Sequence, residues 1–75
     1  MKYVIVELQT IADGSVQNIV TVKDNRNDAE SVYHSVLAAA AISDLPAHAA
    51  VLLTSEGQLL RQQCYGETAS GWEES

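Results

Sequence analysis

The segment VYHSVLAAAAISDLPAHAAVLLTSEG, residues 32–57, decides how this chain folds. Nearly all of it is small or apolar, and the turn-forming residues 43–46 divide it into two parts. A bilayer span needs about 20 consecutive apolar residues, and polar residues such as His34, Asp44 and His48 interrupt this stretch. We therefore interpret the segment as a core helix followed by a core strand, and we expect no membrane association.

The helix is predicted over residues 28–42. Its apolar positions recur at the i, i+3, i+4 spacing of one helical face, namely Ala29, Val32, Tyr33, Val36, Leu37 and Ala40. Asn27 and Glu30 have the spacing of a capping box, in which each side chain bonds the other residue's free backbone N–H. Pro46 disfavours helical geometry at the residue before it, so the helix is expected to end near residue 43 or 44.

Four strands are predicted around this helix. Residues 3–10 and 48–54 are rich in apolar residues on both faces, which indicates central strands. Residues 16–22 alternate and residues 58–65 are mixed, so both are interpreted as edge strands, and Gly14 and Gly57 supply the hairpin turns. The sequence therefore predicts an α+β fold of ββαββ order: a four-stranded antiparallel sheet, order 2-1-3-4, with one helix packed on one face.

The chain has 75 residues, which is enough for a single domain. We assign the ββαββ domain to residues 1–66 and predict that residues 67–75 form an acidic, flexible tail. The tail sequence, ETASGWEES, contains three glutamates and no base. For its one large aromatic residue, Trp72, we expect either packing against the domain or contact with a partner.

Net charge and cysteine content restrict the partners and the compartment. Ten acids and four bases give a net charge of −6, a sign that repels phosphate backbones and argues against nucleic-acid binding. Cys64 is the only cysteine, so a disulfide within the chain is impossible. A single unpaired thiol suits a reducing compartment, and we expect a cytoplasmic protein.

The residues that could carry chemistry each have a plain structural interpretation. His34 follows Glu30 by one helical turn, a pair that resembles half of a metal or acid–base site but is also typical of a solvated i, i+4 pair. Arg61 falls on the opposite strand face from Cys64, which is interpreted as a small buried thiol. His48 marks a strand entrance. We predict no catalytic residue, no metal, no cofactor and no small-molecule substrate, and therefore a protein that is not an enzyme.

The body of the chain, residues 3–65, resembles a family of small uncharacterised bacterial proteins associated with prophages and mobile elements. The most distinctive part is ESVYHSVLAAAAISDLPAHAAVLLTSEG, residues 30–57. The resemblance implies an intracellular bacterial accessory protein. It assigns no activity and no catalytic residue.

One helix can cover only one face of the predicted sheet. We predict that the uncovered face carries Tyr3, Ile5, Ile19 and Arg61, together with Leu52 or Leu53. An exposed apolar face of this kind invites a partner. The leading hypothesis is an intracellular protein–protein interaction module that forms a homodimer, with Tyr3, Ile5, Ile19 and Arg61 as the partner-binding residues.

Three alternatives stay open at the level of the sequence. An acidic inhibitor or nucleic-acid mimic could occupy a basic protein groove if its carboxylates lie in a line on one face. A metal-binding or enzymatic role would use His34, His48 and Cys64. A dimer could also form by edge-strand pairing through residues 58–65 instead of through the sheet face.

Overall fold

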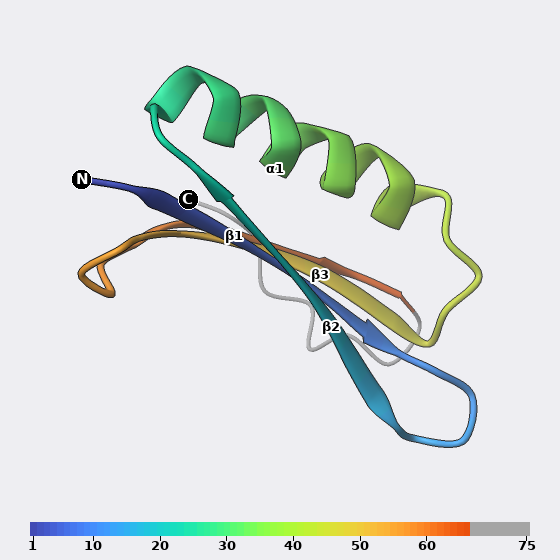
Figure 1. The fold of residues 1–75 in the computed structure, drawn as a ribbon. Helices are drawn as coiled ribbons and strands as arrows, with labels where there is room; N and C mark the ends of the chain where they lie inside the picture. The colour runs from blue at the N-terminus through green and yellow to red at the C-terminus, as the bar shows by residue number, and fades with distance from the viewer. Residues whose placement is uncertain (67–75) are drawn as a thin grey trace.

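A computed structural model describes residues 1–66 and shows one sheet with one helix. Its elements, in chain order, are strands β1 (Tyr3–Thr10) and β2 (Val16–Lys23), helix α1 (Arg26–Ala41), and strands β3 (Ala47–Thr54) and β4 (Leu59–Tyr65). The strand order is β2-β1-β3-β4, and all neighbouring strands are antiparallel. The helix lies against one side of the sheet (Figure 1). The predicted ββαββ fold and strand order are confirmed.

Both hairpins close with the same three-residue turn. In the first, Gly14 N donates to Ile11 O and Ile11 N donates to Ser15 O, each at 2.9 Å. Gly14 has φ of 91°, and among residues 1–66 only glycines have a positive φ. A type I′ turn needs positive φ at both central residues, and these turns have it only at the glycine. Each is therefore a three-residue turn in which one glycine in the left-handed conformation forms a bulge. Gly57, also at φ 91°, plays this role between β3 and β4.

The helix begins two residues before the predicted start, because a different capping pair is used. Asn25 is the N-cap: its Oδ1 accepts from Asp28 N at 2.9 Å, and its Nδ2 donates to Asp28 Oδ2 at 3.0 Å. The predicted cap at Asn27 is wrong. Glu30, its proposed partner, is held instead by arginine side chains, as described below. An acidic Asp28 in the first turn also interacts favourably with the helix dipole.

The core lies between α1 and the two central strands. Ile5 and Leu52 from the sheet pack with Ala29 and Tyr33 from the helix, and each of these four side chains is almost completely buried. The predicted apolar face of the helix is confirmed, since Val32, Val36 and Leu37 pack against this cluster. Small residues at the contact, such as Ala29 and Ala50, let the helix approach the sheet closely.

The predicted side of the sheet is wrong for all four proposed partner-binding residues. Ile5 is in the core beneath the helix and Tyr3 packs against it, while Arg61 contacts the helix residue Glu30. Ile19 is half-exposed, but it pairs with Glu7 and therefore shares the face that the helix covers. The predicted grouping of these residues on one face holds. Alternation decides which residues share a face, and it does not decide which face the helix selects.

Ile5→Val is expected to lower the free energy of unfolding by about 0.5–1.5 kcal/mol, because it removes a methyl group from a packed core. Ile42→Val makes the same chemical change at a side chain that is 85% exposed and is expected to change the free energy by less than about 0.5 kcal/mol. Urea denaturation of both variants measures the difference. Equal costs for the two substitutions would contradict the placement of Ile5 beneath the helix.

Candidate functional site

The sheet face opposite α1 is the main candidate surface, and we call it the open face. Because Ile5 points to the helix, strand alternation and the observed registers show which residues belong to the open face. They are Val4, Val6, Leu8 and Thr10 of β1, Val16, Asn18, Val20 and Val22 of β2, Ala47, Ala49, Val51 and Leu53 of β3, and Leu59, Gln62 and Cys64 of β4. Within residues 1–66 no helix or strand lies over this face (Figure 1).

The open face is mainly apolar, and none of its strand residues is charged; the exposed ion pair of Lys2 and Asp24 lies just beyond the ends of β1 and β2. Val16, Val20 and Val22 have exposed fractions of 60%, 56% and 53%. In contrast, the charged strand residues Glu7, Lys23 and Arg61 all belong to the face that the helix covers. An antiparallel sheet with one wet face normally shows the reverse, with polar residues toward water. Because of this inversion, the open face is the candidate surface for contact with another apolar surface.

A row of side chains crosses the middle of this face. Val6 of β1 is paired with Val20 of β2 on one side and with Val51 of β3 on the other. Val51 is in turn paired with Gln62 of β4. The centre of the face is therefore a strip of three adjacent valines, and the amide of Gln62 lies at its border.

The open face is large enough for a specific interface. Four strands of seven or eight residues form the sheet. With strands about 4.8 Å apart and a rise of about 3.3 Å per residue, the flat area of one face is roughly 500 Å². Two such faces in contact bury about 1,000 Å² in total, and the side chains that protrude from the flat sheet add to this area. This value reaches the lower limit of specific protein interfaces.

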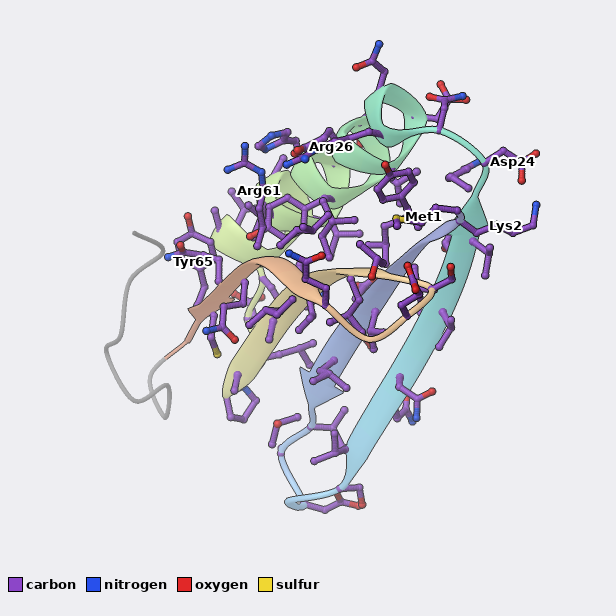
Figure 2. The ribbon with its side chains drawn as sticks, turned by 90° about the vertical axis from the view of Figure 1, so that its left-hand side faces the viewer. Met1, Lys2, Asp24, Arg26, Arg61 and Tyr65 are labelled. Carbon is purple, nitrogen blue, oxygen red and sulfur yellow. The ribbon has the colours of Figure 1, made fainter. Side chains whose placement is uncertain are left out.

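The covered face holds an ionic cluster centred on Glu30 of α1. Arg61 Nε of β4 donates to Glu30 Oε2 at 3.1 Å and lies 2.8 Å from Oε1, and Arg26 Nε donates to Oε2 at 3.3 Å. Figure 2 shows both arginines on the helix side of the sheet. Partial burial acts to raise the pKa of Glu30, but the hydrogen bonds from Arg61 and Arg26 outweigh it and lower this pKa overall. The cluster fastens the helix to the edge strand β4.

A second polar group lies in the covered layer between the central strands. His48 Nε2 is 2.6 Å from Glu7 Oε2, and Gln9 Nε2 donates to the same oxygen at 2.7 Å. The His48 side chain is 6% exposed, and its Nδ1 is buried without a hydrogen-bond partner among the described residues. The spacing of residues on β1 and β3 contained no signal for this contact. It depends on the register that places Gln9 opposite His48.

The three residues of the hypothetical metal site lie on three different surfaces. His34 is on the solvent side of α1, 3.6 Å from Glu30 Oε1, whose carboxylate already binds the arginines. His48 is beneath the helix, whereas Cys64 is on the open face, so the sheet separates them. Within residues 1–66 no group of three His, Cys, Asp or Glu side chains is arranged to hold a metal ion. A shared site of His34, His48 and Cys64 is therefore excluded by this geometry.

The predicted tail, including Trp72, lies outside the described residues. Among residues 1–66, α1 is too short and too polar to cross a bilayer. Comparisons of the chain with known protein families, with curated protein sequences and with solved structures find no match.

Glu30→Gln is expected to show a stability defect that depends on pH. The pKa of Glu30 is lower in the folded state than the unfolded value of about 4.3. Its stabilising contribution is therefore present above that value and is lost as the pH falls through the folded-state pKa. We expect a deficit of about 1 kcal/mol at pH 7, since both arginines are partly exposed, and we expect the deficit to shrink below about pH 4.3.

Urea denaturation at pH values from 3 to 7 measures this deficit. Glu56→Gln is the matched control, because Glu56 is an exposed carboxylate in the turn between β3 and β4. Its effect is expected to stay within about 0.5 kcal/mol. A Glu30→Gln deficit that grows as the pH falls would contradict the assignment.

Proposed function

We propose that this protein is a small interaction module that associates with a second copy of itself through the open face. The observation that carries the proposal is the inverted sheet: its strand charges lie beneath the helix, and its valines face outward. Contact with another apolar face would remove these valines from water, at about 25 cal/mol per Å² of apolar area.

The chemistry of the open face favours a protein partner over a nucleic acid or a lipid headgroup. Binding to phosphate requires Lys or Arg side chains on the contact surface. The four bases of the chain are Lys2, Lys23, Arg26 and Arg61, and none of them is a residue of the open face. Lys2 is paired with Asp24 near the start of α1, as Figure 2 shows.

A second copy fits this surface in charge and in shape. Each chain carries a net charge of −6, so two copies repel each other unless their contact surfaces are free of like charges. The open face meets this condition. Two twisted sheets pack about 10 Å apart with their strands rotated by about 30°, and the valines at the centre of each face are the residues that would interdigitate.

The tail of the same chain is the main competing occupant. Residues 67–75 contain Trp72 as their only large apolar side chain, among three glutamates. Such a segment offers a single apolar anchor, so it would leave most of the open face available to a second copy. Covering four strands requires a larger apolar surface, which another sheet provides.

Four of the seven acids in residues 1–66 argue against the alternative of a nucleic-acid mimic. Glu7 and Glu30 are engaged on the covered face. Asp13 and Glu56 lie in turns at opposite ends of the sheet. A mimic needs its carboxylates in a row along one face, and these positions form no such row.

Val6→Lys is expected to abolish association through the open face. It places an ammonium group at the centre of the valine strip, where no acid is available to pair with it, at a cost of several kcal/mol. We expect affinity to fall at least about 100-fold. Sedimentation equilibrium should then show a mass half that of the unmodified assembly at the same concentration.

Ser31→Lys is the matched control, because it adds the same charge at an exposed position on the helix and is expected to leave the mass unchanged. A variant lacking residues 67–75 should also keep the mass of the full chain. Doubling of the mass after this deletion would instead identify the tail as the occupant of the open face. An unchanged mass for Val6→Lys would refute the proposed surface.

A further inference from the structure

The two edge strands of the sheet differ in how they are protected. β4 has an irregular register opposite Leu52 and Leu53 and carries Arg61 near its middle. β2 is paired regularly with β1 over all eight of its residues. It contains no proline, and its single charge, Lys23, is at its end. Edge strands of sheets are usually protected against pairing with another chain by charges, prolines or bulges. Within the described residues, the outer edge of β2 has none of these before Lys23.

The backbone groups that β2 presents at this edge can be identified. Ile11 N donates to Ser15 O across the first turn, which makes this pair a hydrogen-bonded one. Along an antiparallel ladder such pairs alternate with pairs whose N–H and C=O groups point outward. The outward groups of β2 therefore belong to Val16, Asn18, Val20 and Val22. Gln17, Ile19 and Thr21 direct their groups to β1.

We propose that the outer edge of β2 pairs in antiparallel fashion with β2 of a second copy, around a two-fold axis at Ile19. The open faces of both copies must lie on the same side of the extended sheet, so each residue must pair with a partner residue that belongs to the same face. With the axis at Ile19, Val16 pairs with the partner's Val22, and Asn18 pairs with the partner's Val20. Every outward group of the four residues then has a hydrogen-bond partner.

Other symmetric registers satisfy fewer of these groups. An axis at Val20 leaves Val16 opposite the partner's Asp24, which is beyond the end of β2. An axis at Asn18 leaves Val22 opposite the partner's Gly14, in the turn. With the axis at Ile19, Lys23 lies opposite the partner's Ser15, so no like charges face each other across the edge. The valines of the two open faces then form one continuous surface.

The edge axis is perpendicular to the sheet, whereas the axis of face-to-face association is parallel to it. Two perpendicular two-fold axes that intersect generate a closed tetramer. This tetramer rests on the proposed function, because it needs the open-face contact. The pairing of β2 edges does not need that contact.

Val20→Pro tests the edge directly. Proline removes the Val20 N–H, which points outward, and leaves the hydrogen bonds to β1 intact, an arrangement that edge strands tolerate. Val20→Ala is the matched control, since it also removes the valine side chain from the open face but keeps the N–H. We expect the edge affinity of Val20→Pro to be at least about 10-fold weaker than that of Val20→Ala. Asn18→Pro against Asn18→Ala is the second pair, should Val20→Pro fail to fold.

Sedimentation equilibrium separates the two interfaces. If both exist and their axes intersect, the unmodified chain is a tetramer, Val20→Pro and Val6→Lys are each dimers, and the double variant is a monomer. Suppose instead that association is lost in Val6→Lys but is equally strong in Val20→Pro and Val20→Ala. This result would overturn the edge inference and support the proposed function. The reverse pattern supports the edge and refutes the open face. A monomeric unmodified chain overturns both.

Amide hydrogen exchange provides a readout at single residues. Edge pairing predicts that the amides of Val16, Asn18, Val20 and Val22 are protected at high protein concentration and exchange faster on dilution. Gln17, Ile19 and Thr21 should stay protected at both concentrations, because they bond to β1. Fast exchange of all four outward amides in the assembled protein would overturn the inference.

Discussion

The packing of Ala29 and Tyr33 of α1 against Ile5 and Leu52 of the central strands decides which face of this sheet is buried. Both faces contain large aliphatic side chains, and the described residues supply one helix, which covers one of the two faces. Because the helix selects the face with Ile5 and Leu52, the valines of β1, β2 and β3 are directed outward. The open face, its lack of charge and its proposed occupant all follow from this one contact.

The helix selects the face that is poorer in aliphatic side chains for a physical reason. Small residues such as Ala50 on the covered face leave room for the large ring of Tyr33. The same face also contains the side chains that need partners: Arg61 reaches Glu30, and His48 reaches Glu7. The helix supplies Glu30 as the partner of Arg61, whereas the partner of His48 is Glu7 on the neighbouring strand. The valine face has no such groups, and it therefore suits contact with a surface of the same kind.

The strands, the helix and the sheet order could be predicted from the sequence because they depend on local patterns. Strand alternation, the apolar stripe of the helix and the two glycine turns each specify their own segment. The side of the sheet could not be predicted, since it depends on contacts between distant residues such as Arg61 and Glu30. The helix cap was misplaced for a similar reason: both Asn25 with Asp28 and Asn27 with Glu30 have the required spacing, and Glu30 is engaged elsewhere. The candidate site was therefore recognised as a sheet face, but its residues were taken from the wrong side.

Intermolecular NOEs would test the central claim most directly. The sample is an equal mixture of carbon-13-labelled and unlabelled chains, in which a filtered experiment detects only contacts between different molecules. We expect such contacts among the methyl groups of Val6, Val20 and Val51, and none from Ile5 or Leu52. Intermolecular contacts from Ile5 or Leu52, or an associated state without contacts from the three valines, would contradict this claim.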